Sequence, residues 1–138
     1  MKRKITSIIT LFLVAVLTLT ACGADGITAE ELWSGATYSA DTALGSGETT
    51  VQVHIEALGR KVTVTLSTDK PTLGEALFEA GIVDDPTFFS ECNGMTADWN
   101  AHSAYWAFYI GEEYQIIGVG DAALTDGAAY RLVYTQEK

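Results

Sequence analysis

Four residues of this 138-residue chain have side chains that commonly bind metals or act as nucleophiles: Cys22, His54, Cys92 and His102. A zinc site needs several such ligands at short, fixed spacings. These four residues are spread over most of the chain and form no such motif. We therefore expect no metal site and no resident cofactor.

Catalytic motifs are also missing from the sequence. Ser90 and Ser103 lie outside the Gly-x-Ser-x-Gly context that exposes a nucleophilic serine. Glu112 and Glu113 are neighbours in a turn and have the pattern of solvated charges, not of an acid/base pair. We expect that the protein is not an enzyme. Cys92 leaves two alternatives open, because an unpaired cysteine is either a small buried side chain or a reactive thiol.

Aromatic residues are concentrated between positions 105 and 109. In a strand, Trp106 and Phe108 would share one face and Tyr105 and Tyr109 the other, because side chains alternate. One pair is then expected to fill the core. The other pair either lies beneath a loop or is free to stack on a flat ligand or a partner surface.

The N-terminus has the parts of a secretory signal. Three basic residues, 2–4, precede an uncharged apolar run over residues 5–19. That run is shorter than the roughly 20 residues that span a bilayer, but it has the length of a signal-peptide core. The following Leu19-Thr20-Ala21-Cys22 resembles the lipobox of bacterial lipoproteins. The alternative is an ordinary cleaved signal with an incidental cysteine.

The lipobox resemblance implies how and where the protein is held. In that family the cysteine thiol receives a diacylglyceryl group, and the chain is then cut just before it. Residues 1–21 would be the signal peptide, and Cys22 would anchor the protein to membrane lipid on the outer face of the cell membrane. Two acyl chains on one cysteine suffice for stable anchoring.

The charge of the remaining chain limits its partners. Residues 1–21 hold three of the eight Lys and Arg residues and none of the eighteen Asp and Glu residues, which leaves a formal charge of −13 after cleavage. Nucleic acid is therefore excluded as an expected partner, because its binding relies on basic contacts to phosphate. Anionic headgroups would repel such a surface, so we expect the lipid alone to anchor it.

The mature chain is long enough for one domain. Residues 22–48 are rich in small and polar residues, which predicts a flexible tether after the lipidated cysteine. Within it, residues 27–33 are compatible with one helical turn that docks on the domain. We expect the folded domain over residues 49–138.

The periodicity of residues 49–138 predicts an α+β fold. Residues 50–57 and 61–67 alternate apolar and polar around a glycine turn, which indicates a β-hairpin. Thr72 followed by Glu75 indicates a capped helix over residues 72–81. Further strands are predicted at residues 88–92, 104–110, 114–117 and 129–135. One short helix on a mixed or antiparallel sheet is a β-grasp-like arrangement.

An ordered set of short motifs resembles a known family. The set is Thr72-Leu73-Gly74-Glu75-Ala76-Leu77, Asn93-Gly94, Tyr105-Trp106-Ala107-Phe108-Tyr109-Ile110 and Asp126-Gly127. It resembles the DUF4430 domain, which is similar to the C-terminal β-domain of the cobalamin carriers transcobalamin and intrinsic factor. In those carriers the β-domain closes over a corrinoid that a separate helical domain holds. This chain has no helical domain, so corrinoid binding would need a partner chain or a shallow site.

The resemblance implies a ligand against loops 94–104 and 117–122. The candidate ligand-binding residues are Trp99, His102, Tyr105, Trp106, Tyr109, Gly118 and Gly120. Two hypotheses follow. The first is a non-enzymatic, membrane-anchored extracellular binding module for cobalamin or another corrinoid. The second is a surface protein-interaction or cell-envelope assembly module that binds no small molecule.

Overall fold

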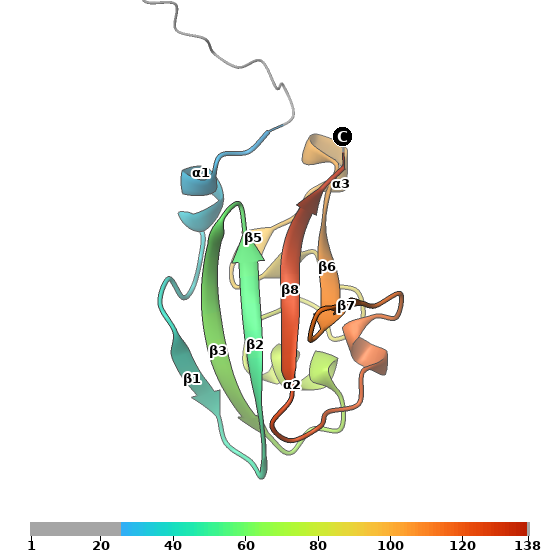
Figure 1. Cartoon of the computed structure of the whole chain (residues 1–138). Coiled ribbons are helices and arrows are strands. Elements are labelled where there is room, and N and C mark those ends of the chain that lie inside the picture. The colour runs from blue at the N-terminus through green and yellow to red at the C-terminus, as the bar shows by residue number, and fades with distance from the viewer. Residues whose placement is uncertain (1–25, 138) are drawn as a thin grey trace, which may run out of the picture.

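The computed structural model describes residues 26–137, so the predicted signal peptide and Cys22 lie outside the described residues. A six-stranded sheet with the order β1-β3-β2-β8-β6-β7 forms the centre of the molecule (Figure 1). Its strands are β1 (Thr42–Gly45), β2 (Thr49–Ala57), β3 (Arg60–Thr68), β6 (Ala104–Ile110), β7 (Glu113–Tyr114) and β8 (Ala129–Gln136). A separate hairpin consists of β4 (Glu91–Cys92) and β5 (Met95–Thr96).

The predicted hairpin is confirmed as β2 and β3. The two strands pair antiparallel, and Val53 lies opposite Val64 with both side chains buried. The apolar residues of each strand fall on one face because side chains alternate. Leu58 and Gly59 connect the strands with φ values of 48° and 81°. Positive φ at both central residues is the geometry of a tight two-residue hairpin turn.

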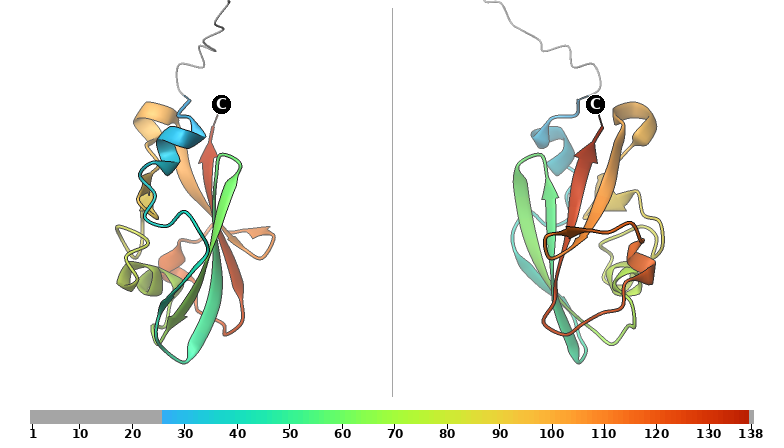
Figure 2. Two further views of the ribbon diagram at one scale, coloured as in Figure 1. Left: turned by 90° about the vertical axis from the view of Figure 1, so that its left-hand side faces the viewer. Right: turned by 45° about the vertical axis from the view of Figure 1, so that its right-hand side comes forward.

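The sheet is mixed, as the sequence predicts. Strand β8 lies at its centre, parallel to β2 and antiparallel to β6. Figure 2 shows helix α2 (Leu73–Glu79) and the β4–β5 hairpin on one side of this sheet, while the β7 turn projects on the other. The α+β class is therefore confirmed. Two further short helices, α1 (Ala29–Trp33) and α3 (Trp99–His102), and a 3-10 turn η1 (Val119–Asp121) complete the fold.

Helix α2 follows the predicted capping pattern. The Thr72 side chain accepts a hydrogen bond from the backbone N–H of Glu75, and Gly81 adopts a φ of 74° just beyond the helix. Leu73 and Leu77 are fully buried against the sheet. The capped N-terminus and the left-handed glycine thus delimit the helix, and its apolar face fixes it on the core.

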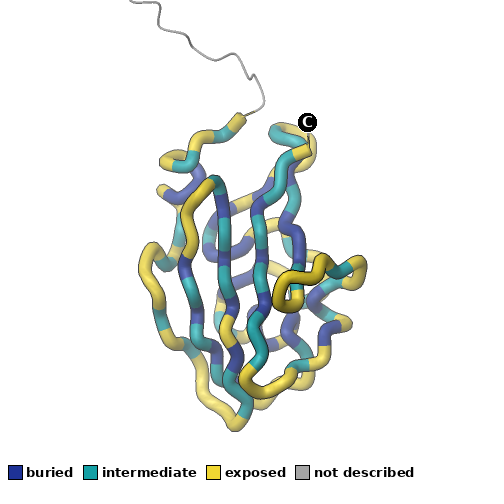
Figure 3. The backbone as a smooth tube through the Cα atoms, in the orientation of Figure 1, coloured by how far each residue is buried: buried dark blue, intermediate teal, exposed yellow. Residues whose placement is uncertain are grey.

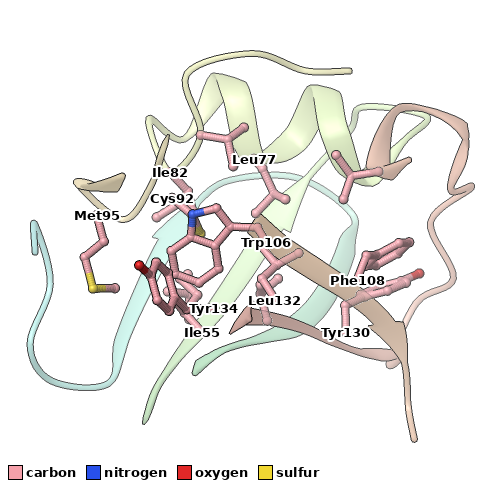
Figure 4. Close-up of a cluster of buried hydrophobic side chains, with 14 of the residues drawn as sticks. Ile55, Leu77, Ile82, Cys92, Met95, Trp106, Phe108, Tyr130, Leu132 and Tyr134 are labelled. Atoms are coloured by element: carbon pink, nitrogen blue, oxygen red, sulfur yellow. The ribbon is translucent and has the colours of Figure 1, made fainter. Parts of the chain in front are cut away.

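The core lies between the covered face of the sheet and the elements packed on it. Figure 3 shows the buried residues alternating along the central strands. Ile55 and Leu132 from the sheet lie with Leu77 of α2 and Met95 of β5 in one cluster (Figure 4). Cys92 is part of this cluster and is fully buried. This outcome matches the interpretation of Cys92 as a small core side chain.

The structure corrects the predicted tether over residues 22–48. From residue 26 onwards this segment belongs to the fold, and the predicted turn of helix is the capped helix α1. Leu32 and Trp33 of α1 are buried, and the Trp33 indole N–H donates to the carbonyl of Ala57 at 2.9 Å. Strand β1 then pairs parallel to β3. Composition alone did not reveal these contacts, because they depend on partners distant in sequence.

Two predicted strands are shorter than expected. Residues 88–92 form a strand only at β4, because the carboxylates of Asp84 and Asp85 accept backbone N–H bonds from residues 87, 88, 90 and 91 and hold a turn. The predicted strand at residues 114–117 is limited to β7, whose two residues pair with β6. No helix among residues 26–137 is long and apolar enough to cross a membrane.

Candidate functional site

Strand β6 carries the aromatic residues that the sequence singled out. Trp106 and Phe108 face the core, where Trp106 meets Tyr134 edge-on at 5.7 Å and Phe108 stacks on Tyr130 at 6.1 Å. Trp106 is only 9% exposed. Its side chain therefore packs mainly in the core, and its role as a ligand-binding residue stays a prediction. Its indole N–H and the Tyr134 hydroxyl have no hydrogen-bond partner among the described residues.

Tyr105 and Tyr109 lie on the opposite, open face of the sheet. The ring of Tyr109 meets Tyr114 of β7 edge-on at 5.5 Å, and the Arg131 guanidinium lies 4.8 Å from its centre. Tyr105 lies 6.4 Å from Trp99 in a tilted arrangement. Both tyrosines are partly exposed, so this face offers aromatic surface to solvent.

Arg131 provides the positive charge on this face, but acidic residues neutralise it. Its guanidinium donates twice to Glu56, at 2.6 and 3.3 Å, and lies 3.5 Å from Glu112. The hydrogen bonds to Glu56 raise the pKa of Arg131 above its ordinary value. The arginine therefore supports the Tyr109 ring and is not a free anion-binding group.

A groove of about 380 Å³ runs beside β6, on the edge that faces away from β8. Residues 105–108 form its floor, residues 87–89 line one part of its wall, and residues 114–119 line another. Phe88 and Ile116 stand on this wall and are 85% and 94% exposed. Large apolar side chains that are so exposed in one place are typical of a binding surface.

A second hollow of equal volume lies between α1 and β3, and its lining includes Glu30, Arg60 and Lys61. Its charged lining offers no aromatic or aliphatic contact beyond Trp33 and Val62. Ligand pockets are mostly apolar with a few polar groups. The groove beside β6 therefore has the chemistry of a binding site, and the second hollow does not.

The two candidate glycines have mainly a packing role. A Cβ atom on Gly120 would approach the Pro86 carbonyl to 3.0 Å, and one on Gly118 would approach the Thr87 carbonyl to 3.2 Å. Gly74 of α2 packs against the same Pro86 carbonyl and the Gly120 backbone. These glycines let three backbone segments lie in contact behind the groove. Gly118 also lines the groove, whereas Gly120 does not.

Trp99 and His102 are separate from the groove. They form the two ends of α3, where the Asp98 carboxylate accepts the backbone N–H of Ala101. Trp99 is 54% exposed. Hydrogen bonds with Thr28 lower the pKa of the Glu31 carboxyl in α1, and His102 lowers it further to a smaller extent, so His102 lies near α1. Of the predicted residues, the structure brings only Tyr105, Trp106 and Gly118 to the groove.

Several residues that line the groove are not among those predicted from the sequence. They are Thr87, Phe88, Phe89, Tyr114, Gln115 and Ile116. Phe88-Phe89 and Ile116-Ile117 were assigned to strands, in which one member of each pair would be buried. A signal was available: both pairs are adjacent apolar residues next to turn-forming residues, not part of a longer alternating run.

Metal and thiol chemistry have little support in the described residues. Residues 26–137 contain no group of three His, Cys, Asp or Glu side chains placed to hold a metal ion. The Cys92 side chain is fully buried, and burial, followed by the charges of Asp84 and Glu91, strongly raises the pKa of its thiol. A nucleophilic cysteine needs the opposite shift and solvent access.

Comparisons with known proteins define the fold and no more. No protein-family model and no curated protein matches the sequence. Among solved structures, the chain is similar to one from Ruminococcus gnavus ATCC 29149 that is described as a "putative metal binding protein". The two superpose with a TM-score of 0.61 at 22% sequence identity, over 66% of this chain and 100% of the other. At this identity the likeness establishes a shared fold.

Proposed function

We propose that this protein is a lipid-anchored, extracytoplasmic binding module without catalytic activity, which holds an apolar segment of a partner protein in the groove beside β6. One observation carries the proposal: Phe88 and Ile116 are almost fully solvent-exposed on the wall of this groove. A monomeric protein gains no stability from such side chains. Their burial against a partner would remove apolar surface from water.

The anchor is the part of the proposal that rests on the sequence. The charged N-terminus, the apolar run and the lipobox-like Leu19-Thr20-Ala21-Cys22 support cleavage before Cys22 and its acylation. Mass spectrometry of the protein isolated from membranes tests this. We expect an N-terminal peptide that begins at Cys22 and carries diacylglyceryl. An unmodified terminus, with the protein free in the medium, would remove the anchor.

Binding in the groove is tested by crosslinking in the native envelope. A photoreactive amino acid at Ile116 is expected to crosslink one partner, whereas the same group at Phe78 is not. Phe78 is a matched control because it is 51% exposed on α2 and lines a different hollow. Identical crosslinking patterns from both positions would contradict a binding role of the groove.

Corrinoid binding is the second candidate function. It is supported by the resemblance to the carrier β-domains and by the aromatic rings of Tyr105 and Tyr109, which are partly exposed, and of Tyr114, which is exposed. We place it second because the groove is open, whereas small-molecule sites usually enclose most of the ligand. Titration with cobalamin and cobinamide, followed by absorbance and calorimetry, tests it. If titration at high micromolar concentration produces no heat and no spectral change, corrinoid binding is excluded.

The proposed absence of catalysis has its own test at Cys92. Alkylation of the native protein with iodoacetamide near neutral pH is expected to leave this thiol unmodified, while alkylation in denaturant modifies it. Rapid modification of the native protein would reopen the enzymatic alternative.

A further inference from the structure

The outer edge of β6, away from β8, has no strand partner at Trp106, which lines the groove. Strand β7 pairs with β6 only at Tyr109 and Ile110, and no other strand among residues 26–137 pairs on this side. Between Ala104 and Phe108, Trp106 is therefore the residue whose backbone lies at the outer edge without a strand partner among residues 26–137. Such an edge is a template for another strand, because its N–H and C=O groups need partners.

The hydrogen bonds at the two ends of this free stretch show which backbone groups face the groove. The Ala104 N–H donates to the Asp98 carbonyl at 3.4 Å, and the Phe108 carbonyl accepts from Gln115 N–H at 2.8 Å. Both bonds lie on the side away from β8. Backbone groups alternate in direction along a strand, so the N–H and C=O of Trp106 face this side too. The Trp106 side chain is in the core while its backbone is at the open edge.

The walls of the groove suit an extended chain. Phe88 stands on one wall segment, and Tyr114, Ile116 and Ile117 stand on the other, all exposed. Alternate side chains of an added strand would point to opposite faces of the sheet. In strand addition, main-chain bonds provide affinity and such flanking apolar contacts provide selectivity.

The charges around the groove define the flanks of the added segment. No Lys or Arg lines the groove. The Asp85 carboxylate accepts a hydrogen bond from the backbone N–H of Phe88. Glu113 and Asp121 lie near the lining residues Tyr114 and Val119 in the sequence. Among the described basic residues, Lys70 and Arg131 are paired with Glu79 and Glu56. The surroundings are therefore acidic, and a basic segment complements them.

From these observations we infer that the free edge of β6 accepts an extended segment of another protein, with alternating apolar side chains and basic flanks, as an additional β-strand. This inference rests on the proposed groove and specifies how the partner is bound. It differs from simple apolar docking because it requires backbone amide groups in the partner.

A designed peptide, Lys-Val-Thr-Val-Thr-Val-Lys, is the probe. It is titrated against the full protein purified in mild detergent, with anisotropy of a label on the peptide as the readout. We expect saturable binding that is at least about tenfold weaker when alternate backbone amides of the peptide are N-methylated. Replacing both Lys with Glu is expected to weaken binding similarly, and added salt should reduce that difference.

Two substitutions locate the binding. Ile116→Asp is expected to weaken binding about tenfold, whereas the charge-matched Phe78→Asp on α2 leaves it unchanged. Hydrogen exchange gives an independent readout: the peptide segment that contains Trp106 should be protected when the probe is bound. Circular dichroism confirms that both exposed-site variants remain folded.

Each contrary result has a defined meaning. If the N-methylated probe binds as tightly as the unmodified one, and Ile116→Asp still weakens binding, strand addition is overturned but the apolar groove remains the binding site. Equal effects of Ile116→Asp and Phe78→Asp overturn the groove itself. Absence of saturable binding up to about 1 mM overturns the inference. Equally tight binding of the Glu-flanked probe overturns the basic flanks.

Discussion

Asn93 joins two parts of the chain that are distant in sequence. Its side-chain amide accepts from the Tyr38 N–H at 2.9 Å and donates to the Tyr38 carbonyl at 2.8 Å. The side chain is fully buried, and its backbone has a φ of 54° in the β4–β5 turn. A single residue thus closes the hairpin and holds the N-terminal segment against it.

Substituting Asn93 separates these two roles. Asn93→Gly suits the positive φ but removes both hydrogen bonds, whereas Asn93→Ala removes the bonds and adds backbone strain. We expect Asn93→Gly to lower the free energy of unfolding by about 2 kcal/mol, because buried polar groups lose partners. Asn93→Ala should lower it further by about 1 kcal/mol. Urea denaturation measures both, and a wild-type value for Asn93→Gly would contradict a structural role for the side chain.

Because of Cys92, the free energy of unfolding should change with pH in the alkaline range. Burial raises the pKa of its thiol in the folded state, so the folded protein keeps the proton where the unfolded chain, with a thiol pKa of about 8.5, loses it. When the pKa is raised in the folded state, the stability is unaffected below the thiol pKa of the unfolded chain and decreases as the pH rises above that pKa. The folded state should therefore lose stability above about pH 9, by about 1.4 kcal/mol per pH unit.

The reference for this effect is Cys92→Ala, with Cys22→Ser in both proteins so that Cys92 is the only thiol compared. All other ionisable groups are the same in both proteins and cancel in the difference. Urea denaturation at pH 8 and pH 10 should give a smaller difference in free energy of unfolding at the higher pH. Parallel pH profiles would show that the thiol ionises in the folded state, contrary to its burial.

At the scale of elements, substitutions in α1 test whether the N-terminal segment contributes to the stability of the domain. Trp33 of α1 is 8% exposed and is bonded to Ala57. We expect Trp33→Ala to lower the free energy of unfolding by about 3–5 kcal/mol, the usual range for a buried tryptophan. Glu30→Ala, an exposed position on the same helix, should change it by less than about 0.5 kcal/mol. Equal stability of the two variants would indicate that this segment is a flexible tether after all.

The elements that the sequence predicted well are those with strong local patterns. β2, β3 and β8 alternate over eight or nine residues, and α2 has a capping threonine and a terminal glycine. Helix α1 and strand β1 have four or five residues each. Elements this short depend on packing with distant partners, so their periodicity is too brief to identify them.

The candidate site was predicted in part for the same reason. The two faces of β6 follow from alternation, and Tyr105 and Tyr109 were correctly separated from Phe108. Which face is covered depends on where α2 and the β4–β5 hairpin pack, and that is tertiary information. The groove walls come from two loops joined through glycine contacts, which no local pattern encodes.

At the scale of the whole molecule, several elements gather at one end. Figure 1 shows α1, the β2–β3 turn, α3 and the C-terminal end of β8 together there, with α2 at the opposite end. Only five residues separate Cys22 from Thr28, the N-cap of α1. If Cys22 is acylated, the chain between them spans at most about 20 Å, even fully extended. The α1 end of the domain must then lie close to the headgroups.

Trp99 reports on this orientation because it lies at the same end and is 54% exposed, while Trp33 and Trp106 are 8% and 9% exposed. Tryptophan favours the membrane interface. In vesicles, we expect phospholipids with a quencher near the headgroup to reduce the emission of the acylated protein. Trp99→Phe should remove most of this quenching, and the non-acylated Cys22→Ser protein should show little quenching.

Electrostatics should contribute little to this contact. The α1 end carries the exposed Arg60 and Lys61 but also the exposed Glu30, Glu31 and Glu137. Because opposite charges are mixed there, quenching of Trp99 should change little when neutral lipids replace anionic ones, or when salt is added. Strong salt dependence would assign the contact to charge instead of the short lipid link. Equal quenching in the acylated protein and in Trp99→Phe would place this end of the domain away from the bilayer.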